Sequence, residues 1–421
     1  MSRKRSERVR DIARGAEEAV SGERKCPPLS REGSPAVKSP GSILIDGGTG
    51  NGTELLGVAR SHILDPSHRD PAVRKSRKVL LVTAAWQQEE FNEAHLKNHL
   101  YAWGVAPVIA GAVEENVQNL SLYHEFDKFV ASEPGLGGRY RAKQASVQLV
   151  SRLYRRSTRA GVELLEAQLG EIKAEFPEVG LAELLDEEPS PDRWGHRDFS
   201  REEIANRLKR IQKNDSWLIR CLDRIEETFA RDSALKGNPL WQKKREVMAR
   251  RIRESATIVI YGGHLPVLIN RLHFFDLAPV FEEALGNGTT IVARSAGTMV
   301  LGDRIVVYHD DHVDRHHTFE LLGRGMGLVS RVLVLPRHVQ RIRQDSCDHL
   351  AFLARRFGQR VCVGLEDKSL LLMETVWSEG QERSRYAAMR GGAVHFTRDG
   401  EVRRLTAGSE LAVDELAGHE E

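Results

Sequence analysis

Short apolar segments that end in small residues recur along this chain and alternate with segments of helical periodicity. They include SILIDGG, KVLLVTAAW, TIVIYGG and NGTTIVARSAG. Buried strands that alternate with helices are typical of a parallel sheet covered on both faces. We therefore predict an α/β fold in which helices flank a mostly parallel sheet.

The alternation stops between residues 121 and 254, where no strand pattern is found. Arginine-rich stretches with helical spacing fill this region, and the first long one ends before Pro177. The stretch from Ser200 to Glu203 fits a capping box, so a second long helix is predicted to begin there. We predict a large all-helical insertion between two parts of the core.

The sequence divides into segments of different character. Residues 1–41 are polar and basic, a composition typical of a disordered tail. We assign 42–120 to the first part of the core, 121–254 to the insertion, 255–412 to the second part of the core and 413–421 to an acidic tail. The second part ends in GGAVHFTRDGEVRRLTAG, which predicts antiparallel strands joined by a turn.

Composition restricts the kind of protein. The formal net charge is only +2, which gives no general argument for nucleic-acid binding. No apolar run has the length of a membrane span, and the N-terminal residues lack an apolar signal core. The four cysteines are scattered and form no Cys-x-x-Cys pair, which is typical of a reducing compartment. We expect a cytoplasmic protein without nucleic-acid or membrane partners.

Ser295 stands at the end of a predicted buried strand and is followed by two small residues, Ala296 and Gly297. A sharp strand-to-helix turn needs small neighbours, exposes the serine oxygen and directs backbone N–H groups toward it. Arg294 is bulky and breaks a strict Gly-x-Ser-x-Gly pattern. A serine in this place is also a common helix N-cap, so the motif alone leaves both interpretations open.

Other strand ends supply possible partners for a nucleophilic serine. The turn YGGH, residues 261–264, is a suitable place for a second oxyanion N–H group. His338 follows the apolar run RVLVLP and is the candidate base, while Asp310 and Asp311 are candidate acids.

Several stretches in this order resemble the serine peptidases of the dipeptidase E and cyanophycinase family, peptidase family S51. They are ILIDGG, KVLLVTAAW, IVIYGG, ARSAGTMVLG, GMGLVSRVLVLPRH, VCVGLEDKSLLLM and GGAVHFTRDG. The resemblance implies a class I glutamine amidotransferase-like fold, a peptide or amino-acid-derived substrate and no cofactor. It makes Ser295 the nucleophile, His338 the base, Asp310 the acid with Asp311 as a close competitor, and Gly263 and Ala296 the oxyanion donors.

The chain departs from the family pattern at three places. His264 follows the glycine pair where the family has Asn or Asp, and Pro336 to Val339 differ from the usual surroundings of the base. Arg341 and Arg343 stand one position earlier than the arginines of cyanophycinases. His264, Arg341 and Arg343 are therefore candidate substrate contacts, and the departures concern the substrate more than the chemistry. No cysteine occupies the turn, which argues against the thiolate chemistry of glutamine amidotransferases.

Two further motifs could be interpreted as a zinc site and a phosphate-binding loop. The stretch YHDDHVDRHHTFE, residues 308–320, holds residue types that bind zinc, but it lacks His-Glu-x-x-His spacing. The stretch GGTGNG, residues 47–52, is glycine-rich but lacks the Lys-Ser/Thr of a phosphate-binding loop. We interpret both as loops near the mouth of the sheet and expect no metal.

The insertion leaves two functions open. Its arginines are interleaved with acids, as on solvated helix faces with surface ion pairs. The functional alternatives are a lid over the serine, an oligomerisation arm or a platform for a partner, and a homo-oligomer contact through the core is a further option. The first hypothesis is therefore a serine hydrolase, and the second is a non-catalytic binding or regulatory module on the same fold.

Overall fold

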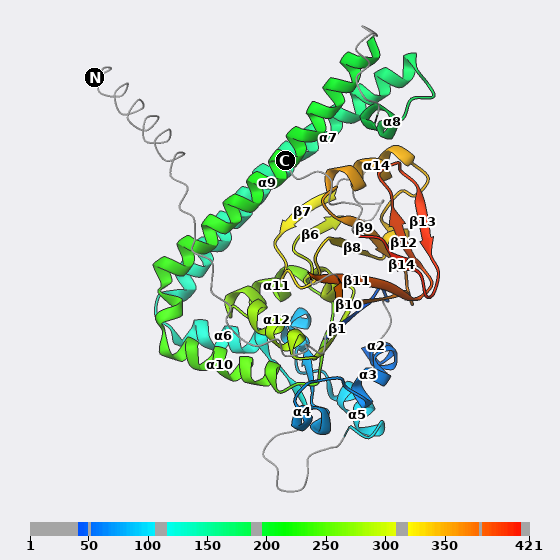
Figure 1. Cartoon of the computed structure of the whole chain (residues 1–421). Coiled ribbons are helices and arrows are strands. Elements are labelled where there is room, and N and C mark those ends of the chain that lie inside the picture. Colours follow the sequence, from blue (N-terminus) through cyan, green and yellow to red (C-terminus); the bar gives the residue numbers. More distant parts are fainter. Residues whose placement is uncertain are drawn as a thin grey trace, which may run out of the picture. The chain divides into compact units, whose positions relative to one another are not determined.

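A computed structural model of the 421-residue chain describes residues 41–48, 52–105, 116–186, 196–308, 319–378 and 381–413 (Figure 1). Within this described part, strands and helices alternate over both halves of the predicted core. Residues 38–421 group into one compact unit.

The largest sheet has eight strands in the order β14-β11-β10-β1-β5-β4-β2-β3. Five of them run parallel: β1 (Ser42–Asp46), β5 (Thr290–Arg294), β4 (Thr257–Ile260), β2 (Val79–Val82) and β3 (Val117–Asn119). Three are antiparallel to their neighbours: β10 (Leu370–Ser378), β11 (Gln381–Arg390) and β14 (Glu410–Leu411). The sheet is therefore mixed.

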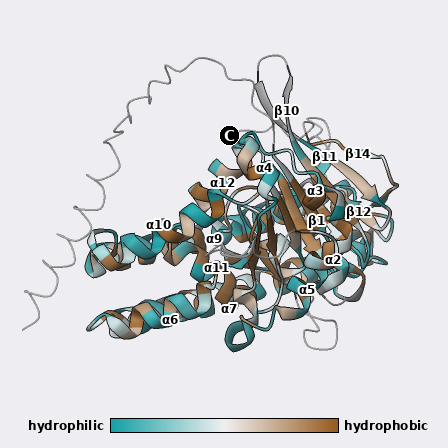
Figure 2. Ribbon diagram, turned by 90° about the horizontal axis from the view of Figure 1, so that it is seen from below, coloured by the Kyte–Doolittle hydropathy of each residue, from teal (hydrophilic) through white to brown (hydrophobic). Residues whose placement is uncertain are grey.

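The parallel strands are short apolar runs because helices cover both of their faces. Every residue of β1, β5, β4 and β2 is buried. The register pairs Asp46 with Arg294 and Ile260 with Ala293, so β1, β5 and β4 end at one edge of the sheet. That edge carries the candidate site. Figure 2 shows β1 among strands coloured as hydrophobic.

A second sheet has the order β13-β12-β9-β8, and a third consists of β6 and β7. The strands are β6 (Ile305–Tyr308), β7 (Phe319–Gly323), β8 (Val332–Pro336), β9 (Val361–Leu365), β12 (Ala393–Phe396) and β13 (Val402–Leu405). Strands β8 and β9 are parallel, with Pro336 opposite Leu365, so they also end side by side.

The helices of the core are short. They are α2 (Gly52–Val58), α3 (Arg60–Leu64), α4 (Pro71–Ser76), η2 (Ala84–Glu89), α5 (Ala94–Ala102), α11 (Leu265–Phe274), α12 (Ala278–Gly286), α13 (Ala296–Met299), η4 (His338–Gln340) and α14 (Cys347–Arg356).

Between β3 and β4 the described residues form helices. They are α6 (Leu122–Ser132), α7 (Leu136–Glu175), α8 (Leu181–Asp186), α9 (His196–Ser233), η3 (Leu235–Gly237) and α10 (Pro239–Arg253). The two long helices α7 and α9 pack side by side (Figure 1).

A buried polar network ties α7 and α9 to the core. The Tyr154 hydroxyl of α7 donates to Oδ1 of Asp215 on α9 at 2.7 Å. The fully buried Arg356 of α14 donates to both oxygens of Asp215 and to the Tyr154 hydroxyl. Buried charge pairs of this kind need full hydrogen bonding to offset desolvation, and here each guanidinium nitrogen has an acceptor.

Several predicted elements differ from those observed. The capping box at Ser200 is wrong, because α9 begins at His196 and Ser200 lies inside it. The stretch PVLINRLHFFDLAPVFEEAL, residues 266–285, has a helical pattern in the sequence and forms two helices, α11 and α12, separated at Asp276, whose φ is 50°. The apolar stretch PVIAGAV, which begins at Pro107, also has the pattern of a strand, but it lies outside the described residues, and β3 follows it.

Candidate active site

Ser295 joins β5 to α13 with a strained backbone. Its φ of 51° and ψ of −120° lie in a region that residues other than glycine rarely adopt, at a typical cost of about 1–3 kcal/mol. The Ser295 amide donates to the Asp46 carbonyl at 3.2 Å, and the Ser295 carbonyl accepts from the Thr298 amide and hydroxyl. These bonds fix the turn, and Ser295 itself remains partly exposed.

Glycines allow the turn to pack tightly against β4. A Cβ on Gly297 would lie 2.5 Å from the Ile260 carbonyl oxygen. A Cβ on Gly262 would lie 2.9 Å from the Ala296 nitrogen and 3.0 Å from the Ser295 Cβ. The turn after β4 therefore touches the serine turn directly.

Of the predicted oxyanion donors, Ala296 takes part in this contact, and Gly263 follows Gly262, which does. Gly263 is exposed, with φ of 146°, and its backbone approaches Ala85 so closely that a Cβ would lie 2.7 Å from the Ala85 carbonyl oxygen. The Trp86 indole N–H donates to the Gly262 carbonyl at 3.2 Å. Within the described part of the chain, the amides of Gly263 and Ala296 donate to no backbone carbonyl. Both remain candidates to bind an oxyanion.

Arg294 explains how a bulky residue fits beside the serine. Its side chain is buried, and Nε donates to the Gly48 carbonyl at 2.7 Å and lies 3.4 Å from Oδ2 of Asp46. Its Nη2 donates to Oε2 of Glu54 at 3.1 Å. Burial raises the pKa of Asp46, and Arg294 opposes that rise. Arg294 thus links the end of β5 to the residues at and after the end of β1.

His338 begins η4, one residue beyond Arg337, which follows β8, and its side chain is fully buried. The ring packs against Gly364, where a Cβ would lie 2.6 Å from Cγ of the imidazole, and against Phe396 at a centroid distance of 5.5 Å. Burial lowers the pKa of His338, and the neighbouring Glu366 opposes this. Among the described residues, neither ring nitrogen has a hydrogen-bond partner.

Glu366 is a site residue that the sequence reasoning missed. Its Oε1 lies 3.7 Å from Nε2 of His338. The signal was present in the sequence, because Glu366 follows the buried run VCVGL as His338 follows RVLVLP. Two parallel neighbouring strands bring the residues after their ends together. The same rule that selected His338 therefore selects Glu366.

The backbone of the turn after β1 contacts both the serine turn and the chain at Glu366. The Ser295 amide donates to the Asp46 carbonyl, as described above. A Cβ on the next residue, Gly47, would collide with the Glu366 carbonyl oxygen. Ser295 and Glu366 therefore flank the same short turn, and His338 lies against Glu366.

The other predicted residues are placed as follows. Asp310 and Asp311 lie outside the described residues, as do most of the histidine-rich stretch and residues 49–51 of the glycine-rich stretch. His264 caps α11, with Nδ1 accepting from the Val267 amide at 3.3 Å. Arg341 lies over the Tyr308 ring at 5.8 Å, and Arg343 is exposed. In the described ranges, no group of three or more His, Cys, Asp or Glu residues could hold a metal ion.

The fold is a mixed α/β fold with a large sheet and many helices. Residues 230–376 match the model of peptidase family S51. The match covers β4, the Ser295 turn, His338 and Glu366, and it agrees with the family resemblance seen in the sequence motifs. It indicates a serine peptidase in general terms.

Two other comparisons complete the description. The crystal structure of a peptidase from an acI-B1 Actinobacterium is similar with a TM-score of 0.40 and 12% sequence identity, over 89% of this chain and 97% of that chain. No curated protein sequence matches this chain. No helix in the described ranges is long and apolar enough to cross a membrane.

Proposed function

We propose that this protein is a serine hydrolase that cleaves an amide bond through an acyl-enzyme on Ser295. The observation that carries the proposal is the strained backbone of Ser295 between β5 and α13. Strain of this kind persists where the surrounding structure fixes it, and it is common at the nucleophiles of α/β enzymes. A plain helix N-cap would have ordinary extended backbone, and its side chain would accept an amide hydrogen bond, which Ser295 does not do in α13.

In the proposed reaction, the Ser295 oxygen attacks the carbonyl carbon of the scissile amide. His338 accepts the hydroxyl proton and passes it to the leaving amine as the C–N bond breaks. The amides of Gly263 and Ala296 stabilise the negative charge on the former carbonyl oxygen. A water molecule then hydrolyses the ester, and the Ser295 hydroxyl is restored.

The acid that orients His338 is either Glu366 or one of the pair Asp310 and Asp311. The described contacts favour Glu366, since its carboxylate lies beside the imidazole. A carboxylate in this position holds the ring in one tautomer and stabilises the imidazolium that forms during the reaction. We therefore prefer Glu366 to the two aspartates that the resemblance suggested.

The finer features of the proposal follow the family resemblance. They are a class I glutamine amidotransferase-like core, a cyanophycinase-like peptidase activity and a helical insertion over residues 121–254 placed as a lid, an oligomerisation arm or a partner platform. His264, Arg341 and Arg343 are the proposed substrate contacts, since all three belong to the segments around the proposed catalytic residues.

One observation favours the second candidate, a non-catalytic binding module. The His338 side chain has no exposed surface, whereas a general base must reach the serine hydroxyl. Incubation with a peptide library followed by mass spectrometry separates the two candidates. The hydrolase predicts new peptide termini with the wild type and none with Ser295→Ala. Identical peptide patterns for both proteins would favour the binding module.

A further inference from the structure

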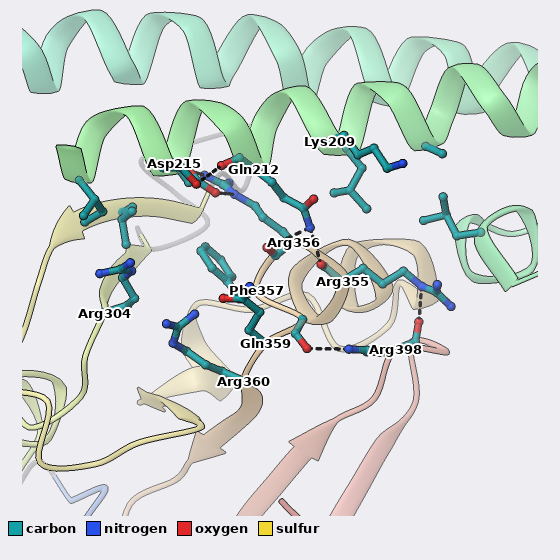
Figure 3. Close-up of a pocket in the computed structure, with 17 residues that line it drawn as sticks. Lys209, Gln212, Asp215, Arg304, Arg355, Arg356, Phe357, Gln359, Arg360 and Arg398 are labelled. Carbon is teal, nitrogen blue, oxygen red and sulfur yellow. Dashed lines mark hydrogen bonds and ion pairs between the residues drawn. The ribbon is translucent and has the colours of Figure 1, made fainter. Parts of the chain in front are cut away.

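A cavity of about 680 Å³ lies between α9 and the core (Figure 3). One wall is the side of α9 from Ala205 to Ile219. The other wall is formed by residues 355–360, at the end of α14 and just after it, together with Arg304, Leu321 and Arg398. We call this cavity the α9 groove. Its volume is in the usual range of ligand sites, about 300–1,000 Å³.

The α9 groove is separate from the candidate active site. Arg360 lines the groove and immediately precedes β9, whereas Glu366 immediately follows β9. Six steps of extended chain span about 20 Å. The groove and the pair His338–Glu366 therefore lie at opposite ends of the same strand.

The lining of the groove is strongly basic. Its charged residues are Lys209, Arg304, Arg355, Arg356, Arg360, Arg398 and a single acid, Asp215. Three of the arginines are neutralised by carboxylates. Arg356 pairs with Asp215, Arg360 with Asp303 and Arg355 with Asp186.

The other three cations have no carboxylate partner among the described residues. The Arg398 guanidinium donates to the Gly358 carbonyl at 2.6 Å, and the Lys209 side chain is on an exposed position of α9. Arg304 is partly buried, and its Nη1 is buried without a hydrogen bond. A buried cation such as the Arg304 guanidinium costs free energy unless it is paired. An anion bound in the groove would lower that cost.

The charges around Arg304 also favour the binding of an anion in the groove. Burial lowers its pKa, and the neighbouring Arg324 and Arg360 lower it further. The carboxylates of Asp303 and Asp223 oppose the shift but are already bonded to Arg360 and Arg324. Positive charge at Arg304 is therefore in excess.

The excess charges lie apart. Figure 3 shows Arg304 on one side of the groove and Lys209 and Arg398 on the other, with Phe357 and Gln359 between them. Apolar side chains complete the walls: Leu185, Leu208, Ile219, Leu321 and Phe357. A compact anion would meet only one end of such a site. An elongated ligand with separated anionic groups and an apolar middle matches both ends.

We propose that the α9 groove binds an acidic peptide segment of another molecule, in extended form, with carboxylates near both ends. The lining positions of α9 span about 21 Å along the helix axis, and six extended residues span about 20 Å. Guanidinium groups pair with carboxylates through two parallel hydrogen bonds. Binding at this groove does not require Ser295, so the inference goes beyond the proposed hydrolysis.

The test is fluorescence anisotropy of a labelled hexapeptide, Glu-Leu-Ala-Ala-Leu-Glu, with all proteins in the Ser295→Ala background so that no cleavage occurs. We expect the acidic peptide to bind at least about tenfold more tightly than its Gln-for-Glu analogue. Arg304→Gln and Lys209→Gln should each weaken binding about tenfold. Both residues lack carboxylate partners, so we expect both variants to fold, and circular dichroism checks this.

Lys213→Gln is the matched control, because Lys213 is an exposed lysine one turn further along α9 and does not line the groove. It should bind the acidic peptide like the parent protein. Equal binding of the two peptides, or an equal loss in all three variants, would overturn the proposal. Displacement of the peptide by a lower concentration of inorganic tripolyphosphate would make the groove a phosphate site instead. Tighter peptide binding after removal of residues 414–421 would identify the chain's own acidic segment as the occupant.

Discussion

The imidazole of His338 and the carboxylate of Glu366 lie 3.7 Å apart at the ends of two parallel strands, β8 and β9. The relationship follows from the register, which pairs Pro336 with Leu365. The next residues of both strands must therefore emerge at one edge of the second sheet. The turn after β1 connects that edge to Ser295 in the first sheet.

The identity of the acid gives the first prediction. Glu366→Gln should lower kcat/KM by about 10²–10⁴-fold, because the amide cannot stabilise the imidazolium that forms in the reaction. Asp310→Asn and Asp311→Asn should have effects of less than about tenfold. Steady-state kinetics on the same peptide substrate compare the three variants. A greater loss in either aspartate variant would move the role of the acid to that residue.

The pH dependence of activity depends on His338. Burial lowers the pKa of this histidine in the folded protein, and a general base acts in its neutral form. Activity should therefore persist below pH 6.5, the ordinary pKa of histidine, and be lost only as the pH falls through the lowered value. A pH profile of kcat/KM measures the acidic limb. A limb at or above pH 6.5 would contradict the assignment of His338 as a base buried in its neutral form.

The close contact between the serine turn and β4 predicts the effect of a single methyl group. Gly297→Ala should destabilise the protein by about 1–3 kcal/mol, because its Cβ would lie 2.5 Å from the Ile260 carbonyl oxygen. Gly57→Ala in α2 is the matched control, since no atom lies within 4 Å of its added Cβ. That change should stabilise by up to about 1 kcal/mol. Urea unfolding of both variants measures the difference, and similar stabilities would mean that the turn is looser than described.

Arg294 and Asp46 predict a pH-dependent stability effect. Arg294→Met removes the cation beside a buried carboxylate and should cost about 3–5 kcal/mol at pH 7.5. Burial already raises the pKa of Asp46, so the protonated form is more favoured in the folded state than in the unfolded state. Stability from this group is therefore greatest at low pH and is lost as the pH rises through the folded pKa.

Loss of Arg294 raises the pKa of Asp46 further, so the destabilisation should be smaller at pH 5 than at pH 7.5. Urea unfolding at both values checks this. The double variant Arg294→Met with Asp46→Asn should show no such dependence on pH, because the titrating group is gone. A pH dependence that survives in the double variant would assign the effect to another group.

The sequence predicted those parts of the fold that depend on local pattern. Apolar runs such as those of β1, β4 and β5 are continuous because both faces are buried, and His338 was chosen as the candidate base because it follows such a run. The division into three sheets could not be predicted, since β8 and β9 have the same pattern as the strands of the first sheet and differ only in their neighbours. The buried contacts of Arg294 could not be predicted, because its partners, Gly48 and Glu54, are distant in the sequence.

Glu366 was missed for a different reason. The proposed acids, Asp310 and Asp311, follow Ser295 closely in the sequence. Pairing between β8 and β9, in contrast, decides which carboxylate lies beside His338. The basic α9 groove could not be predicted from the sequence either. Its excess positive charge depends on which arginines meet a carboxylate, and mixed charge along α9 gives no sign of that.

The most direct test of Ser295 as a nucleophile is labelling with a fluorophosphonate probe, followed by mass spectrometry to locate the modified residue. An activated serine in the Ser295 turn predicts a single adduct on Ser295 in the wild type, lost in Ser295→Ala and strongly reduced in His338→Ala. A folded wild type that stays unlabelled, or an adduct on a different serine, would contradict the assignment of Ser295 as the nucleophile.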